Sequence, residues 1–364
     1  MGAGLKDNSK SPVIYCAVIF LVTFGIYWNS LQGDFIWDDR GLILENTSYL
    51  GDWSNLVSTF TKPFFGTTPF YRPLLLVSFI LDYQLWGLNA FGYHFSNVLL
   101  HALNGLMVYL LVFLLFKQRT FALIAGLLFV THPIQTEAVA WISGRNDVLL
   151  TFFSLLTIIG YLKWRNPQRT KGFFAYAGFL LCYCCVLLTK ESGIILPVLI
   201  VLVDYFFRNR LPHPVDGRRK IYLPLMLISA LYIYVRINLL GGAIQEVEGV
   251  NIFHTFPGVI ITYAYYFKML LFPVVQTASP PILLVDSFQS PVFMTSLFLV
   301  GSLVVVTVAC WKRFRELSFL LLWIIVALLP FSGIIPHPVP ALEHRLYLAR
   351  VCLSMVIPLL FYRM

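Results

Sequence analysis

Long apolar runs recur along this sequence, and most are close to the length of a helix that crosses a bilayer. The runs cover about 13–31, 97–116, 121–141, 147–164, 173–189, 193–207, 221–240, 291–311, 317–335 and 346–361, with a weaker one at 256–276. Only helices or closed barrels satisfy their backbone in lipid, and no barrel-like alternation is visible. The sequence therefore predicts an all-α integral membrane protein, a polytopic bundle of about 10–11 transmembrane helices.

Charge placement sets the expected orientation of these helices. The chain is 59% hydrophobic and 12% charged, and its net charge is +9. Most of the 26 basic residues lie in short segments between apolar runs, the pattern of cytoplasmic loops. This placement predicts an inner N-terminus and indicates the bilayer, rather than nucleic acid, as the partner. All six cysteines fall inside apolar runs, where we expect buried free thiols rather than disulfides or zinc ligands.

The first outer loop, about 32–95, is the longest, and we expect interfacial helices in it. Its acidic residues are Asp34, Asp38, Asp39, Glu45, Asp52 and Asp82. Asp38 and Asp39 follow Phe35-Ile36-Trp37, which should hold the pair at the membrane surface. Adjacent acids there repel each other unless a cation or hydrogen bonds compensate. We predict that the pair is catalytic, although simple solubility is the alternative. A divalent metal is possible, but spacing fixes no third oxygen ligand.

Topology makes a further demand on residues 241–290. The run at 221–240 ends outside, and Lys312-Arg313 after the run at 291–311 must lie inside. The segment between must therefore cross an even number of times. We predict an outer loop that contains an interfacial helix or, alternatively, a re-entrant one.

A polar stripe marks one face of the run that begins near residue 97. His94, Asn97, His101 and Asn104 share this face, so they should point into the bundle. For Asn97, His101 and Asn104 we expect hydrogen bonds between helices. His94 lies nearer the outer surface and is a candidate for the site.

Charged residues also gather at the other predicted outer turns. The first of these tracts runs from His132 to Asp147 and includes Glu137 and Arg145. Lys190-Glu191 and Glu343-His344-Arg345 occupy later outer turns, and Arg72 lies in the first loop. Ion pairs on wet turns would explain part of this pattern. Together, however, cations for a phosphate and a carboxylate base favour an enzyme that acts on a phosphorylated lipid. No Walker or dinucleotide motif occurs, so we expect the donor to arrive through the bilayer.

Several of these motifs resemble one known family when read in order. They are Asp38-Asp39, Tyr71-Arg72-Pro73-Leu74, Gly92-Tyr93-His94-x-x-Asn97-x-x-x-His101, His132-Pro133-x-x-Thr136-Glu137-Ala138-Val139, Gly144-Arg145-x-Asp147, Lys190-Glu191-x-Gly193 and Glu343-x-Arg345-x-Tyr347. The order resembles the transmembrane region of O-mannosyltransferases that carry tetratricopeptide repeats. These are GT-C-class enzymes that use polyprenyl-phosphate sugars.

The resemblance implies a GT-C-like fold and a glycosyltransferase that moves mannose or a related hexose from a polyprenyl-phosphate donor to an acceptor hydroxyl. Asp38 or Asp39 would be the base. The donor and its phosphate would be bound by Arg72, His94, His132, Glu137, Arg145, Asp147, Lys190, Glu191, Glu343 and Arg345. No 34-residue helical repeat occurs in these residues, so protein and glycan acceptors both stay open.

Localisation and two rival functions complete the expectations. The short loops and the lack of repeats favour a bacterial inner membrane, with the endoplasmic reticulum as the eukaryotic alternative. The rival functions are a flippase or scaffold for lipid-linked sugars and a secondary transporter. Transporters place ionisable residues near the midplane on internal repeats. Here the charges gather in outer loops and no internal repeat is evident.

Overall fold

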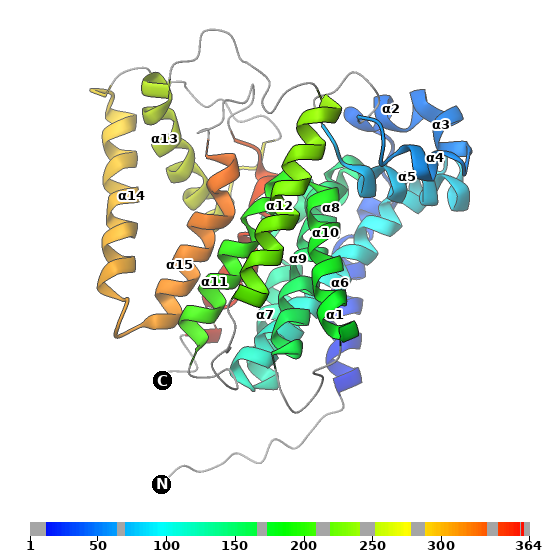
Figure 1. The fold of residues 1–364 in the computed structure, drawn as a ribbon. Coiled ribbons are helices and arrows are strands. Elements are labelled where there is room, and N and C mark those ends of the chain that lie inside the picture. The colour runs from blue at the N-terminus through cyan, green and yellow to red at the C-terminus, as the bar shows by residue number, and fades with distance from the viewer. Residues whose placement is uncertain are drawn as a thin grey trace.

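The computed structural model describes residues 12–63, 70–165, 173–208, 219–240, 252–277, 288–332, 341–356 and 358–359, and it assigns these ranges helices and turns without a strand. The helices are α1 (Pro12–Ile26), α2 (Asp38–Leu42), α3 (Thr47–Gly51), α4 (Asn55–Ser58), α5 (Pro73–Trp86), α6 (Ala90–Phe116), α7 (Arg119–Val130), α8 (Thr136–Ala140), α9 (Arg145–Trp164), α10 (Phe173–Thr189), α11 (Leu196–Phe207), α12 (Arg219–Leu240), α13 (Ile252–Leu271), α14 (Pro291–Ala309), α15 (Arg315–Leu328) and α16 (Arg350–Leu353) (Figure 1). Short 3₁₀ turns join them at η1 (Asn29–Gln32), η2 (Leu44–Asn46), η3 (Pro133–Gln135), η4 (Ile142–Gly144), η5 (Glu191–Ile195), η6 (Leu329–Phe331) and η7 (Glu343–Leu346).

Several of these helices have the length and composition of membrane spans. Four described segments qualify alone, and a fifth qualifies if the bent pair α7–α8 counts as one span. The four are Ala90–Phe116, Ile142–Trp164, Arg219–Leu240 and Pro291–Ala309. Shorter apolar helices accompany them at Pro12–Ile26, Pro73–Trp86, Phe173–Thr189 and Phe256–Leu271. The chain is a multi-pass membrane protein, as predicted, and its helices coincide in position with most of the apolar runs.

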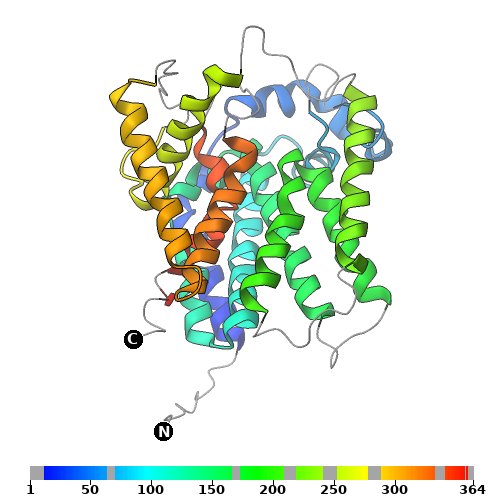
Figure 2. The same cartoon turned by 60° about the vertical axis from the view of Figure 1, so that its left-hand side comes forward.

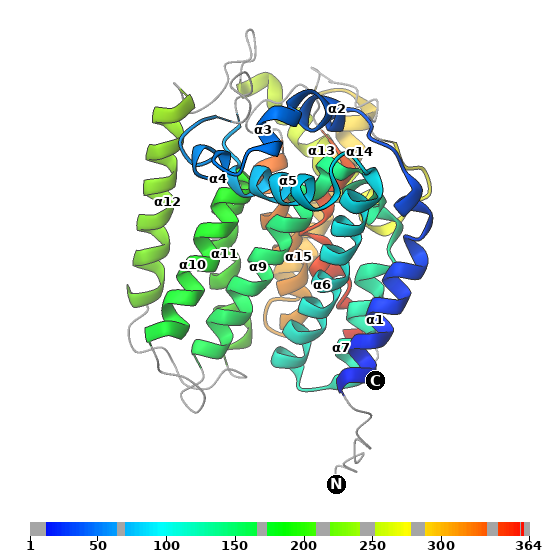
Figure 3. The ribbon, with the colours of Figure 1, turned by 90° about the vertical axis from the view of Figure 1, so that its right-hand side faces the viewer.

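The predicted first outer loop folds into short helices above the bundle. Helices α2, α3 and α4 lie across the upper ends of the long helices (Figure 2). Helix α5 runs crosswise beneath them (Figure 3). Pro73 occupies its first turn, where a missing N–H costs nothing, and Gly87 ends it with φ +59°. Helices α2 to α5 together form a cover over the bundle. This cover holds Asp38 and Asp39 at one end of the molecule.

The core beneath the cover is built on a close approach of α6 and α7. A Cβ atom on Gly105 would lie 2.4 Å from Val130 Cγ1, and one on Gly126 would lie 3.1 Å from the Gly105 carbonyl oxygen. Small residues allow helix backbones to approach this closely in membranes.

The polar stripe of α6 joins helices across this core. His101 Nδ1 lies 2.6 Å from the Tyr347 hydroxyl, and Asn104 Nδ2 donates to the Val148 carbonyl at 2.9 Å. Asn97 Nδ2 donates to main-chain carbonyls of the 139–142 segment, including Val139 at 3.2 Å. The prediction of interhelical hydrogen bonds for these three residues is confirmed.

Two predicted spans are interrupted in the structure. The run at 121–141 divides into α7 and α8, which meet at an angle of 54°. Pro133 lies at this break because proline cannot donate the hydrogen bond that would continue the helix. The run at 346–361 is also not one continuous helix in its described part. It forms turns around the four-residue α16, where the buried Arg350 donates to the Leu128 carbonyl at 2.9 Å.

In the segment predicted as an outer loop at 241–290, the described residues form α13, which packs against α14 (Figure 1). Residues 241–251 and 278–287 lie outside the described ranges. The interfacial or re-entrant path therefore stays a prediction. All six cysteines are free, as predicted, although only Cys352 is fully buried.

The predicted orientation can be tested by cysteine labelling in a background whose native cysteines are replaced. Thr61 is exposed in the cover, whereas Gln118 and Lys312 are exposed at the opposite end. We expect Thr61→Cys to react with an impermeant maleimide in intact cells, and Gln118→Cys and Lys312→Cys to react only after permeabilisation. The reverse labelling pattern would show that the cover faces the cytoplasm, which would contradict the predicted orientation.

Candidate active site

Asp38 and Asp39 begin α2, and the structure separates their environments. Asp39 is fully buried, and its carboxylate accepts hydrogen bonds from the Ile36 amide at 3.1 Å, the Ser143 amide at 2.8 Å and the Ser143 hydroxyl. Burial raises the pKa of Asp39, and these three donors oppose that shift. Asp38 is exposed on the same turn. Asp39 therefore holds the loop to η4, while Asp38 is available to a substrate.

The turn before the pair is strained and packs against the rest of the site. Trp37 has a φ of +47°, a conformation that is uncommon for any residue other than glycine. Its ring contacts the Trp141 ring edge-on, with centroids 5.8 Å apart, and Trp141 in turn lies 5.6 Å from the His344 ring. Two ring contacts thus connect the acidic pair to the charged residues below it.

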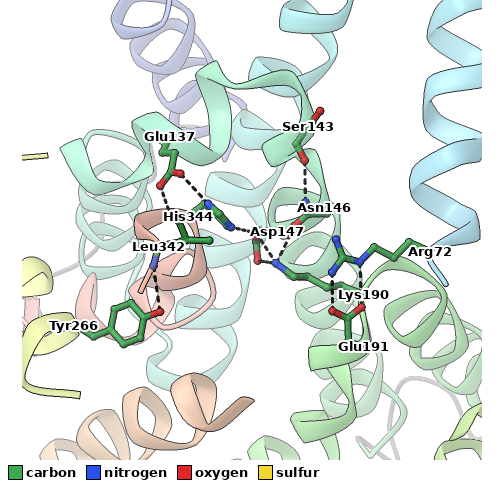
Figure 4. A network of polar contacts seen from close by, with 10 residues as sticks. All are labelled: Arg72, Glu137, Ser143, Asn146, Asp147, Lys190, Glu191, Tyr266, Leu342 and His344. Atoms are coloured by element: carbon green, nitrogen blue, oxygen red, sulfur yellow. Dashed lines mark hydrogen bonds and ion pairs between the residues drawn. The ribbon is translucent and has the colours of Figure 1, made fainter. Parts of the chain in front are cut away.

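Lys190 and Asp147 form the centre of that charged cluster (Figure 4). Lys190 Nζ lies 2.7 Å from both carboxylate oxygens of Asp147 and donates to Asn146 Oδ1 at 2.9 Å. Both charged side chains are at least 95% buried. Asn146 Nδ2 donates to the Ser143 carbonyl at 2.8 Å, so the ammonium group and Asp39 are held by one short segment.

Glu137 and His344 extend the cluster on the other side of Asp147. The two oxygens of Glu137 accept from the His344 main-chain amide at 2.8 Å and face ring Nδ1 at 2.9 Å. Burial lowers the pKa of His344 to about 3, despite the Asp147 carboxylate 3.8 Å from Nε2. The ring is therefore neutral at physiological pH. It can donate through Nδ1 to Glu137, which fixes its orientation.

Arg72 brings the first loop to the same cluster. Its Nε and one terminal nitrogen donate to the two oxygens of Glu191 at 3.0 and 2.6 Å, a bidentate arrangement. Burial raises the pKa of Glu191, but the Arg72 guanidinium outweighs that effect and holds the value at about 2. Glu191 begins η5 directly after Lys190, so the Glu191 carboxylate lies beside two cations, Arg72 and Lys190 (Figure 4).

Arg345 and Glu343 enter the cluster from η7. The Arg345 guanidinium lies over the Phe331 ring at 5.5 Å, and Lys190 Nζ lies 5.1 Å from the centroid of the same ring. Two cations from distant parts of the chain therefore converge. Glu343 accepts from the Thr277 amide at 2.7 Å, and burial raises its pKa.

Two other predicted site residues, Arg145 and His132, have partners elsewhere in the fold, and a third, His94, is buried. Arg145 pairs with Asp82 at 2.5 Å and donates to Asn97 Oδ1 at 2.6 Å, and its side chain is only 1% exposed. His132 caps η3 by accepting from the Ile134 amide at 3.3 Å. His94 is buried next to Gly33, and neither nitrogen of its ring has a hydrogen-bond partner among the described residues. These contacts place Arg145 and His132 in the scaffold, and none of the three side chains contacts Lys190.

Sequence reasoning did not select Asn146, His344, Trp141 or Phe331 for the site. His344 stands between the selected residues Glu343 and Arg345, and this position was the feature of the sequence that could have indicated it. The sequence has 32 phenylalanines, and no feature of it distinguishes Phe331 from the others as a site residue. Within the described ranges, no group of three or more His, Cys, Asp or Glu side chains is arranged to hold a metal ion.

The fold matches a known class of membrane enzyme. The chain superposes on ArnT from Cupriavidus metallidurans, solved with undecaprenyl phosphate bound, with a TM-score of 0.52 at 19% identity. The match covers 97% of this chain and 60% of that one. This likeness confirms the predicted GT-C-like fold.

Part of the sequence also matches a known family. Residues 67–235 match the family model described as dolichyl-phosphate-mannose-protein mannosyltransferase. Human protein O-mannosyl-transferase TMTC2 is 37% identical over 235 residues, and mouse TMTC3 is 31% identical over 249. The predicted resemblance to this family is confirmed. Each alignment covers about 60% of this chain but 27% of the relative, so the chain spans about a quarter of these relatives' length.

Proposed function

We propose that the protein is a membrane glycosyltransferase that moves a sugar, mannose or a related hexose, from a polyprenyl-phosphate donor to an acceptor hydroxyl at the outer face. The relatives are named protein O-mannosyl-transferases, which favours a serine or threonine hydroxyl of a protein. The ArnT structure contains undecaprenyl phosphate, which supports a polyprenyl phosphate as the carrier. The compartment follows the source organism: a bacterial inner membrane or the endoplasmic reticulum.

One observation carries this proposal. The exposed Asp38 projects from a turn that Asp39 fixes to Ser143, and the same segment holds Lys190 through Asn146. The proposed base Asp38 and the buried cation Lys190 are thus positioned by the same segment of the chain, Ser143 to Asn146. A glycosyl transfer from a phosphate needs this pairing.

The reaction assigns a role to each group. The Asp38 carboxylate accepts the proton of the acceptor hydroxyl as its oxygen bonds to the sugar C1. The bond between C1 and the phosphate oxygen breaks, and polyprenyl phosphate leaves with that electron pair. Lys190 and Arg345 stabilise the charge on the departing phosphate. The departing phosphate is stable as an anion, so the base on the acceptor side contributes most.

The activity itself can be measured with defined substrates. We expect the purified protein to transfer mannose from dolichyl- or undecaprenyl-phosphate mannose to a peptide that contains serine and threonine, read by mass spectrometry. Counterflow of a labelled sugar in proteoliposomes tests the transporter alternative, and flipping of fluorescent donor lipid tests the flippase. Flipping or counterflow without transfer to peptide or glycan acceptors would contradict the proposal.

Donor binding should depend on the planar head of Arg345. We expect Arg345→Ala to weaken binding of polyprenyl-phosphate mannose by about 1.5–3 kcal/mol, the contribution of a charge-assisted hydrogen bond. Arg345→Lys should recover only part of the loss, because a point charge replaces the fork. Arg313→Ala, an exposed cation at the opposite end, is the matched control. Titration in detergent measures the affinity, and equal values for wild type and Arg345→Ala would remove this residue from the site.

A further inference from the structure

A concave site lies at the end of the molecule opposite to the acidic pair. It is a groove of about 430 Å³ between the end of α9, the start of α10 and the start of α12. Trp164, Tyr176, Arg219, Lys220, Leu223 and Pro224 line it. Figure 3 shows these three helices side by side, with their lower ends together. The volume falls in the range of small-molecule sites, ~300–1,000 Å³.

The walls of the groove combine aromatic and apolar surface with positive charge. The Trp164 and Tyr176 rings pack against each other with centroids 5.1 Å apart. Arg219 and Lys220 are exposed at its mouth, and in the described part of the chain no carboxylate pairs with either. Two cations without a carboxylate partner in the described ranges therefore lie beside an apolar groove.

The groove is held in shape by contacts directly behind it. The Tyr176 hydroxyl donates to the Lys220 carbonyl at 2.5 Å, which joins α10 to α12. Behind this contact, Asp204 accepts from the Tyr161 and Tyr222 hydroxyls at 2.5 and 2.7 Å and pairs with Arg165. Arg165 and Tyr222 are the chain neighbours of lining residues. Asp204 therefore neutralises Arg165, whereas Arg219 and Lys220 have no carboxylate partner among the described residues.

An apolar surface continues from the groove along α12. Leu223, Leu227, Leu231 and Tyr234 lie on one side of this helix and are 55–66% exposed. Exposed apolar surface on a membrane-crossing helix faces acyl chains. A ligand that fits both parts has an anionic head and long hydrocarbon tails.

We propose that this groove is a binding site for an anionic phospholipid of the leaflet opposite to the active site. Arg219 and Lys220 bind the headgroup phosphate, Trp164 and Tyr176 pack against the glycerol region, and the acyl chains follow the exposed face of α12. Charge complementarity selects this occupant, because the cytoplasmic leaflet is the anionic one and the basic loops are predicted to lie there. The site is separate from the donor site and does not depend on the transferase activity.

Native mass spectrometry of the delipidated protein with added phosphatidylglycerol tests the site. We expect the double variant Arg219→Gln/Lys220→Gln to bind phosphatidylglycerol about 25-fold more weakly, since each basic residue near an anionic surface contributes roughly a factor of five. The matched control is Lys312→Gln/Arg313→Gln, which removes two exposed cations from the same end. The control should keep wild-type affinity, as should Arg345→Ala in the donor site.

Three outcomes would overturn the proposal. Equal weakening in the control pair would mean that charge alone attracts the lipid. Equal affinity for phosphatidylcholine would remove the role of the headgroup charge. Displacement of phosphatidylglycerol by millimolar inorganic phosphate would reassign the groove to a free anion. Unchanged thermal midpoints of both double variants, checked in detergent, exclude unfolding as the cause.

Discussion

Asp38→Asn is expected to lower the rate of sugar transfer by at least two orders of magnitude. The substitution keeps the size of the side chain and its ability to form hydrogen bonds, but it removes the base. A positioned general base contributes ~10²–10⁴ in rate. Asp38 is exposed on its turn, so the variant should fold and bind the donor as the wild type does. Single-turnover transfer to a peptide acceptor measures the effect.

Asp39→Asn is the matched comparison within the pair. Asp39 accepts three hydrogen bonds and is fully buried, so an amide there must turn its NH₂ group away from the amide and hydroxyl of Ser143. We expect a lower thermal midpoint together with loss of activity. Asp38→Asn should lose activity alone. Near-wild-type transfer by both variants would exclude the proposed mechanism and move the flippase or transporter alternatives ahead of it.

The largest loss of stability is expected from Arg145→Met. This substitution leaves Asp82 buried without its cation, although Ser96 still donates to it at 2.7 Å. Breaking a buried ion pair costs about 3–5 kcal/mol. Asn97 Oδ1 and the Tyr93 carbonyl also lose a donor. Thermal unfolding in detergent should show the decrease.

The double variant Arg145→Met/Asp82→Leu separates a structural role from a substrate-binding one. Replacing a whole buried pair by apolar residues is often close to neutral, so the double variant should regain most of the stability. It should also regain donor affinity if Arg145 acts only as scaffold. A stable double variant that fails to bind donor would return Arg145 to the phosphate site, as the sequence had predicted.

Helix positions and the polar stripe of α6 were predictable because both follow from periodicity. Apolar runs set where helices form, and the spacing of Asn97, His101 and Asn104 places them on one face. Partners that are distant in sequence were not predictable. Nothing local links Arg145 to Asp82, so the sequence did not indicate that this guanidinium has a buried carboxylate partner.

The acidic pair shows the same limit of sequence-based prediction for two adjacent residues. Adjacency of Asp38 and Asp39 indicated a functional turn, but not which carboxylate points inward. The answer depends on the strained φ of Trp37 and on Ser143, neither of which the spacing reveals. Lys190 and Glu191 were both predicted to bind the donor, with an ion pair on a wet turn as the alternative, and the structure gives each its own partner, Asp147 and Arg72.

The short segment from Ser143 to Asp147 fixes a length as well as a set of contacts. Ser143 holds Asp39, and Asn146 and Asp147 hold Lys190, so the separation between the proposed base Asp38 and Lys190 is set within five consecutive residues. Every glycosyl phosphate has the same C1–O–P linkage, so in the proposed mechanism this segment sets where that linkage must lie and not which sugar carries it. Variants that accept a new sugar should therefore arise in the walls around this segment, since a change of its length would lose every donor at once.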